Sequence, residues 1–597
     1  MTKQAHFEVL DYILLGTMLC GSMAIGLYFS LAGKRQRTKE EYLLGGRRMT
    51  AIPVCLSLFA TFQSAISLLG TPNEVYTYGT MYIYDIISTT LSNLLAMVTV
   101  VPLIYPLKIT SVNEYLGLRY DSAVVQVVGA VLGVLTSLSY MTIALLSPAL
   151  ALEPTVGIPL WLSIVIVGGV GTVYTTIGGI KSVIWADVFQ TVFIFAGAFT
   201  VLAKGTMNVG GIEKVWDIGH ATGRITLDEI SFDPRVRHTV WGFTFGAMIY
   251  WYSSFYTQVS VQRILSTRCI EDVRKVYIIS IVLTAVYSSI LVLTGLVLTA
   301  YFHVTKCDPL AADFITNNNQ LVPYFVLLTL RFIPGLSGLY IATIFSASLS
   351  TLSSGINALA ANTVEDFISK ILRNKSEAVM TTITKALVCF YGLTCIGLAY
   401  LAKELQGPVT QMTFMAVGAV AGPLLGMFIL GASFPQANYI GALVGCAAGV
   451  SISFGLAIGA FRFGHPTEAL PPGPTDNCSQ ENITSLLTNY SILLTTQSTQ
   501  AMPTESFITT ASTSAESDSK LQDRQLSIFD VSYIWHPVLG VITTIAVGLL
   551  TSVIVSRFMR QKHRPEAKFL FPICRKLWNS GSVLETSIEI DDMDGIE

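Results

Sequence analysis

The chain has 597 residues, of which 52% are hydrophobic and only 12% are charged, whereas about a quarter of the residues in a typical soluble domain carry charge. This composition predicts a polytopic membrane protein, and the net charge of −2 gives no indication of nucleic-acid binding. The nine cysteines show no metal-ligand spacing, so we expect neither a zinc site nor a disulfide framework. Only Cys307 and Cys478 fall in long polar loops, and whether they pair stays open at this point.

Runs of about 20 mostly apolar residues, the length that crosses a bilayer as a helix, predict thirteen spans. The odd number places the two ends of the chain on opposite sides of the membrane. Lys and Arg gather in every second short loop, which predicts cytoplasmic loops there, an extracellular N-terminus and a cytoplasmic C-terminus. The predicted spans are 9–31, 51–78, 82–106, 123–153, 158–178, 181–203, 238–264, 275–302, 323–360 (a short helix, then a long one), 379–402, 409–431, 436–460 and 533–557.

The loop before the last span gives an independent indication of the same orientation. It is rich in Ser, Thr and Pro and carries sequons at Asn477, Asn482 and Asn489, which are glycosylation acceptors on the extracellular side of a plasma membrane. A further sequon at Asn374 falls in a predicted cytoplasmic loop, where we expect no glycan.

The second span contains Gly70 and Pro72 inside an otherwise apolar run. Proline removes a backbone donor and glycine loosens a helix, so we expect a break there that frees backbone carbonyls, although a plain kink or a helix end gives the same pattern. The seventh span, five spans later, is polar and aromatic from Tyr250 to Gln258. Two inverted five-helix repeats, each opening with a discontinuous helix, form an arrangement that binds substrate and sodium at the bilayer midplane.

The predicted organisation follows from these spans. The parts are 1–50 (extracellular N-terminus, first helix and basic cytoplasmic loop), 51–203 (first repeat), 204–237 (extracellular loop), 238–432 (second repeat), 436–460 (twelfth helix), 461–530 (extracellular glycosylated loop), 533–557 (thirteenth helix) and 558–597 (cytoplasmic tail).

The ninth span carries six hydroxyls between Ser346 and Ser354. On a helix, Ala347, Ser350 and Thr351 share one face, because three and four residues make about one turn. A carbonyl and two hydroxyls at one spot could supply half of the oxygen shell of a hard monovalent cation, and another segment would supply the rest. Small polar residues also serve only to let membrane helices approach closely.

Two carboxylates stand inside apolar runs. Asp187 precedes Gln190 by three residues, so both face one side of the sixth span, and Asp85 lies early in the third. An intramembrane carboxylate costs roughly 2.5–3.5 kcal/mol on insertion scales, so each needs a partner. For Asp187, the alternative to a functional role is a structural hydrogen bond near the cytoplasmic interface.

Four stretches carry a resemblance to a known family. LFATFQSAISLLG, TVYTTIGGIKSVIWADVFQT, VQR after the seventh span and SASLSTLSSGINALAANTVEDFI strongly resemble the sodium/solute symporter family, in its branch of iodide, monocarboxylate and multivitamin transporters. The similarity runs from about residue 9 to 560, with the loop 461–530 poorly matched. It implies an all-α membrane protein of the leucine-transporter type, a five-plus-five inverted repeat, and sodium-driven uptake.

The resemblance also implies site residues. The family's common sodium site corresponds to the backbone carbonyls of Ala60, Gln63 and Ala347 and the hydroxyls of Ser350 and Thr351; further sodium-associated positions correspond to Thr61, Asp187, Gln190 and Gln258; and substrate-pocket positions correspond to Ser67, Thr71, Asp85, Tyr140 and Tyr250. Two positions depart from the branch: Asp85 replaces an apolar residue and Thr77 replaces an arginine. A carboxylate beside an anionic substrate is repulsive unless it is protonated or paired.

We therefore expect a symporter that takes up a small organic solute with sodium as the coupling ion and no other cofactor, by alternating access. The first expected substrate is a monocarboxylate or a vitamin carboxylate of the biotin or pantothenate type. A cationic or zwitterionic solute, an inorganic anion such as iodide, a channel-like conductance and a non-transporting sensor are the alternatives. An enzyme is discounted, because the seven histidines form no helical ligand pair and no carboxylate dyad lies in a span. The partners are the solute, sodium and the lipid bilayer, with the oligomeric state open.

Overall fold

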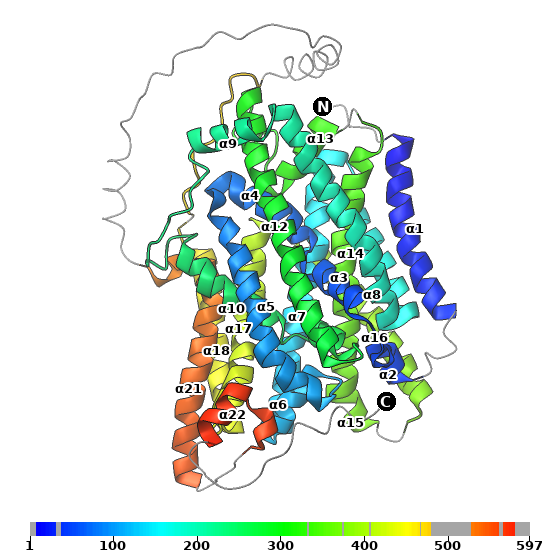
Figure 1. Ribbon diagram of the computed structural model, residues 1–597, viewed down its shortest axis with the longest axis vertical. Coiled ribbons are helices and arrows are strands. Elements are labelled where there is room, and N and C mark those ends of the chain that lie inside the picture. Colours follow the sequence, from blue (N-terminus) through cyan, green and yellow to red (C-terminus); the bar gives the residue numbers. More distant parts are fainter. Residues whose placement is uncertain are drawn as a thin grey trace.

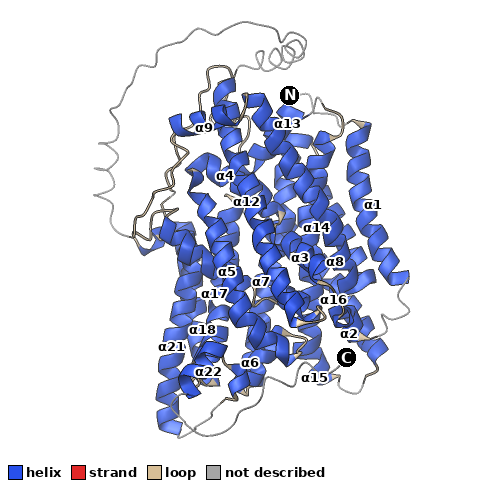
Figure 2. Ribbon diagram, in the orientation of Figure 1, coloured by secondary structure: helices blue, strands red, loops and turns tan. Residues whose placement is uncertain are grey.

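The computed structural model describes residues 8–31, 38–330, 333–372, 375–404, 407–465, 467–478, 527–559 and 565–579. Within these ranges the chain is helical with no strand, and long helices run roughly side by side through the molecule (Figures 1 and 2). The sequons at Asn482 and Asn489 and most of the C-terminal tail lie outside the described residues.

The helices of eight or more residues define the bundle. They are α1 (Val9–Leu31), α3 (Ala51–Phe62), α4 (Ala65–Tyr78), α5 (Asp85–Ile104), α6 (Val112–Tyr120), α7 (Ala123–Val156), α8 (Leu160–Val209), α9 (Ile212–Ala221), α11 (Gln258–Leu265), α12 (Ile270–Thr305), α13 (Leu321–Leu330), α14 (Leu336–Thr363), α16 (Glu377–Leu401), α17 (Val409–Ser433), α18 (Tyr439–Phe463), α21 (His536–Met559) and α22 (Pro572–Asn579). Shorter ones include α2 (Lys39–Leu44), α10 (Met248–Ser254) and α15 (Ser369–Ile371).

The number of spans depends on how broken helices are counted. In the described part of the chain, 10 helices are long and apolar enough to cross a membrane, or 11 if the bent pair α3 and α4 is one span. Helix α8 has 50 residues, about 75 Å, which is more than twice the hydrocarbon thickness. It is interrupted at Gly179, where φ is 60° and ψ is −161°, so it contains the predicted spans 158–178 and 181–203. The total of thirteen stays a prediction.

The break in the second span lies elsewhere than predicted. Gly70 and Pro72 are inside the continuous helix α4, and the chain bends by 56° between α3 and α4, at Gln63 and Ser64. Gln63 has non-helical dihedrals, and the Ser64 side chain accepts a hydrogen bond from the Ile66 N–H at 3.2 Å, which is a helix N-cap. Gly70 instead allows α17 to approach, because a Cβ there would lie 2.0 Å from the Thr410 hydroxyl.

The seventh span is the second broken helix, as predicted. A π-helix at Gly242–Ala247 leads into α10, and α11 begins at Gln258 after a three-residue interruption. The freed carbonyl of Ser254 accepts hydrogen bonds from the Thr257 and Ser260 hydroxyls, both at 2.7 Å. Each set of five spans therefore opens with a discontinuous helix. The first set consists of α3–α4, α5, α7 and the two halves of α8. The second set consists of α10–α11, α12, α13–α14, α16 and α17.

Helix α14 forms the centre of the bundle. Of the residues in the 18-residue apolar stretch of this span, 94% are buried, whereas 17% are buried in the corresponding stretch of the peripheral α1. Helices α3, α4, α7 and α8 pack around α14, while α17, α18 and α21 pack together along one side of the molecule (Figure 1). The hydroxyl-rich segment is therefore enclosed by protein and does not face lipid.

A disulfide closes the end of the molecule where α9 lies. Cys307, just after α12, is bonded to Cys478 with a Cα–Cα distance of 4.9 Å, which answers the question that the sequence left open. The segment before Cys478 crosses the end of α4, where the Leu470 N–H donates to the Thr77 carbonyl at 2.9 Å. Helices α2, α6, α15 and α22 lie at the opposite end (Figure 1).

Candidate sodium site and substrate cavity

The end of α3 meets the middle of α14 through oxygen atoms. The last four carbonyls of a helix have no partner within the helix, and three of the four at the α3 end are bound by side chains from other helices. The Ser350 hydroxyl donates to the Ala60 carbonyl at 2.8 Å and the Thr351 hydroxyl to the Thr61 carbonyl at 3.0 Å. The Tyr140 hydroxyl of α7 donates to the Phe62 carbonyl at 3.2 Å.

The Ala347 carbonyl completes this cluster from within α14. It accepts from both the Ser350 and the Thr351 hydroxyls at 3.1 Å, as the helical spacing predicted. Ala60, Ala347 and Ser350 are fully buried, and Thr351 is 1% exposed. The cluster thus contains neutral oxygens alone, drawn from two helices, which is the donor set that suits a desolvated alkali cation.

Asp187 lies in an adjoining charged network. Its Oδ2 accepts from the Ser57 hydroxyl at 2.6 Å and from Arg263 Nη2 at 3.0 Å, and both charged side chains are fully buried. Arg263 also donates to the Thr61 hydroxyl at 2.8 Å and to the Ser354 hydroxyl. The buried carboxylate is therefore neutralised by a guanidinium, as a buried charge requires.

Arg263 was not among the predicted site residues, although it belongs to the VQR motif that carries part of the family resemblance. An arginine directly after an apolar, broken span was the available signal, because a buried charge needs a partner. Gln190 and Gln258, predicted as sodium-associated, engage other groups: Gln190 Nε2 donates to the Ser22 hydroxyl at 3.0 Å, and the Gln258 amide binds the Val112 N–H at 2.8 Å and the Thr110 carbonyl at 2.6 Å. Their sodium role stays a prediction.

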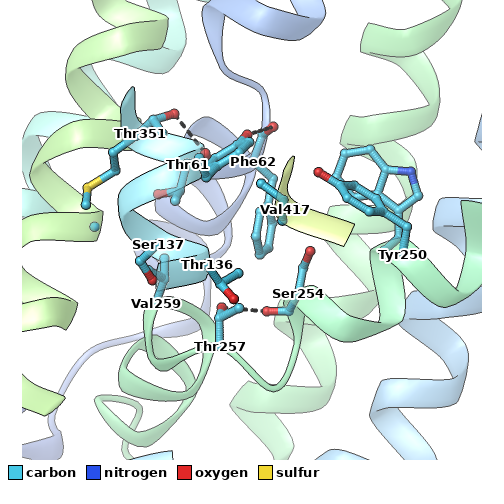
Figure 3. Close-up of a pocket in the computed structure, with 14 residues that line it drawn as sticks. Thr61, Phe62, Thr136, Ser137, Tyr250, Ser254, Thr257, Val259, Thr351 and Val417 are labelled. Carbon is cyan, nitrogen blue, oxygen red and sulfur yellow. Dashed lines mark hydrogen bonds between the residues drawn. The ribbon is translucent and has the colours of Figure 1, made fainter. Parts of the chain in front are cut away.

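A cavity of about 50 Å³ adjoins the oxygen cluster, and we call it the first cavity. Thr61 and Thr351 of the cluster line it, together with the predicted substrate residue Tyr250 (Figure 3). The predicted substrate residue Tyr140 lines it as well. Trp251, Phe62, Thr136 and Val417 also line it and were not predicted. The aromatic middle of the seventh span was the signal for Trp251.

The other predicted substrate residues, Ser67, Thr71 and Asp85, do not line the first cavity. The Ser67 hydroxyl donates to the Ser64 carbonyl at 2.8 Å, and Asp85 accepts from the Trp251 indole at 2.7 Å. Of the three, Asp85 is connected to the cavity through Trp251, which lines it. Direct contact of any of them with a substrate stays a prediction.

The end of the cavity that faces α9 is closed by aromatic and charged side chains. The ring of Tyr250 stacks on that of Phe414 with 4.0 Å between centroids, and Phe414 meets Tyr533 edge-on at 5.4 Å. Beyond them, Arg237 Nη2 binds both carboxylate oxygens of Glu74, at 2.8 and 3.0 Å, with the two side chains 6% and 0% exposed. The structure is thus closed on this side.

Comparison with known proteins agrees with this geometry. The model of the sodium:solute symporter family matches residues 42–449. The chain is 38% identical to the sodium-dependent multivitamin transporter of Oryctolagus cuniculus (96% of this chain, 86% of the relative). It is 38% identical to the human sodium-coupled monocarboxylate transporter 1 (92% and 87%) and 34% identical to the human sodium/iodide cotransporter (94% and 86%). A solved structure of a Na⁺-coupled sialic acid symporter superposes with a TM-score of 0.71 at 22% identity, covering 92% of this chain and 98% of that one.

Two broken helices, five spans apart and joined to a central hydroxyl-rich helix, define a fold of the leucine-transporter type. The family model and the relatives identify a sodium-coupled transporter. In transporters of this architecture, the substrate and ion sites lie where the backbone is irregular. The chain belongs to the sodium:solute symporter family.

Proposed function

We propose that this protein takes up a small monocarboxylate together with sodium. The observation that carries the proposal is the set of α3 carbonyls bound by α14 hydroxyls, because a cation placed there would replace those hydrogen bonds and draw on oxygens from both helices. Sodium-coupled monocarboxylate and multivitamin transporters among the relatives support a carboxylate as the substrate. The sodium/iodide cotransporter among the relatives supports an inorganic anion as the alternative substrate.

Sodium would act by bridging the two repeats. Ala60 belongs to the first broken helix and Ser350 to the central helix of the second repeat, so an ion between them would hold the two repeats together. The first cavity shares Thr61 and Thr351 with the ion cluster, so binding of sodium would shape the wall that the substrate meets. Each sodium that moves inward across 100 mV releases about 2.3 kcal/mol, which drives solute accumulation.

We further propose that the protein resides in the plasma membrane with the α9 end outside. Asn477 next to the disulfide would then be an accessible glycosylation acceptor, and the basic loops near α2 and α6 would face the cytoplasm. The extracellular N-terminus and the cytoplasmic C-terminus follow from the same orientation. Digestion of the surface protein with a glycosidase, for the wild type and for Asn477→Gln, tests whether the α9 end is extracellular.

Uptake of radiolabelled lactate, butyrate, biotin and pantothenate in expressing cells tests the function. We expect saturable uptake that is lost when external sodium is replaced by N-methylglucamine. A sodium current that persists without any solute, and uptake of none of these acids, would refute the proposal in favour of a conductance.

A pair of variants tests the ion site itself. A hydrogen bond to a charged group contributes about 1.5–3 kcal/mol, and we take this as the scale for one hydroxyl–sodium contact. Ser350→Ala and Thr351→Ala should then each raise the half-saturating sodium concentration about 10- to 100-fold, and the double variant should abolish coupled uptake. Ser348→Ala is the matched control, because its hydroxyl on the same helix donates to the Ala144 carbonyl at 2.6 Å. Surface biotinylation normalises the rates. Wild-type sodium dependence in the double variant would place the site elsewhere.

A further inference from the structure

Asp85 is a buried carboxylate whose neighbour is an indole. It is the first residue of α5 and is 6% exposed. Its Oδ1 accepts a hydrogen bond of 2.7 Å from Trp251 Nε1 on α10. A helix N-terminus favours a negative charge, and a hydrogen bond to an ionised acceptor is about twice as strong as a neutral one. Asp85 therefore fixes where the indole of Trp251 lies.

Trp251 stands between two cavities. Besides the first cavity, it lines a second cavity of about 30 Å³ that lies among α3, α5, α10 and α12. Phe62 and Ser254 are the other residues that line both. The ring of Trp251 meets that of Tyr250 edge-on with 5.5 Å between centroids, which limits its movement from the first-cavity side. The indole is thus part of the wall between the two spaces.

The second cavity differs in chemistry from the first. Amide side chains of Gln63 and Asn93 and hydroxyls of Thr89 and Thr284 line it. Asn93 Nδ2 donates to the Thr89 carbonyl at 2.8 Å, but Asn93 Oδ1 is buried with no hydrogen-bond partner among the described residues. A buried acceptor without a partner is costly, and a ligand hydroxyl or amide N–H that reached it would satisfy it.

We propose that Asp85 is a positioning residue that sets the length of the substrate. By holding Trp251 as a wall, it confines the substrate to the first cavity and so selects short monocarboxylates. Once the indole is released, the second cavity becomes a subsite for the hydroxyl- or amide-bearing tail of a longer carboxylate. This inference rests on the proposed carboxylate uptake. It differs from a charge-reading role, because the Asp85 carboxylate lines neither cavity.

Three variants separate positioning from charge. Asp85→Asn removes the charge but keeps an oxygen that can accept from the indole, whereas Asp85→Leu removes both. Trp251→Phe keeps the charge and removes the indole N–H. Uptake of butyrate, pantothenate and the cation tetramethylammonium is measured for each as KM and maximal rate, normalised to the protein at the cell surface.

We expect Asp85→Asn, whose amide oxygen accepts a weaker, neutral hydrogen bond from the indole, to raise the pantothenate-to-butyrate ratio by no more than about threefold. Asp85→Leu and Trp251→Phe should each raise that ratio about tenfold, the equivalent of one lost charged hydrogen bond, through a lower KM for pantothenate with butyrate unchanged. Adding Asn93→Leu to either should remove the gain, because the subsite acceptor is lost.

Two results would overturn the inference. In one, Asp85→Asn and Asp85→Leu alike lower tetramethylammonium uptake and raise that of both acids, which would show that the Asp85 carboxylate recognises the charge of the substrate. In the other, the ratio stays at the wild-type value in both Asp85→Leu and Trp251→Phe at measurable surface levels. Failure of the wild type to take up any carboxylate is a separate result, and it refutes the proposed function together with this inference.

Discussion

The buried pair of Glu74 and Arg237 should control opening on the α9 side. Arg237 Nε and Nη2 make three hydrogen bonds to the Glu74 carboxylate at 2.8–3.2 Å, and Arg237 Nη1 donates to Gln411 Oε1 of α17 at 2.9 Å. The guanidinium also lies over the ring of Tyr78, 4.0 Å from its centroid. The pair thereby ties α4 and α17 to the segment that enters the seventh span.

Removing one partner leaves the other charge buried in the closed form. That costs about 3–5 kcal/mol, whereas neutralising both partners together is often close to neutral. If opening hydrates the remaining charge, Glu74→Gln or Arg237→Gln relieves the penalty only in the open form. The equilibrium should then move toward the open form by a factor on the order of 100 to 1,000. The double variant should move it much less.

Accessibility of a cysteine placed at Val417 measures this shift. Val417 lines the first cavity on α17, so Val417→Cys should react with an external, membrane-impermeant thiol reagent only when the α9 side opens. We expect faster modification in each single variant than in the double variant or the parent, with the protein that retains Val417 as the background control. Equal rates in the parent and both single variants would refute the reasoning, and a double variant as fast as the singles would show that the lost contacts matter more than the unpaired charge.

Three further perturbations follow from the structure. Arg263→Gln should abolish surface expression, because Asp187 is left fully buried and unpaired, and Asp187→Asn in the same chain should restore part of it; surface biotinylation checks both. Cys307→Ser and Cys478→Ser should lower the thermal unfolding temperature of the purified protein equally and without additivity, because they remove the same bond; an additive loss would contradict the pairing. Gly179→Ala should destabilise the protein by 1 kcal/mol or more, about the strain of a region that only glycine adopts, seen as a lower unfolding temperature; an unchanged temperature would contradict it.

The half of the oxygen cluster that lies on α14 was predictable because its geometry is local. Ala347, Ser350 and Thr351 share a face by helical spacing alone, and the structure places them as expected. The position of the break in the second span was not predictable from Gly70 and Pro72. Pro72 removes a backbone donor and an interior proline commonly kinks a helix, yet α4 continues through it, whereas the weaker signal of an N-cap serine at position 64 marks the true break.

The sequence by itself determined the class of protein, its helical architecture and the half of the oxygen cluster that lies on α14, because apolar length and a 3.6-residue period act within single segments. Only the tertiary structure decided which distant groups complete those segments. The pairing of Asp187 with Arg263, the disulfide from Cys307, and the contact of Asp85 with Trp251 join residues 76, 171 and 166 positions apart. A buried charge or thiol shows that it needs a partner, but packing of the whole bundle selects which one.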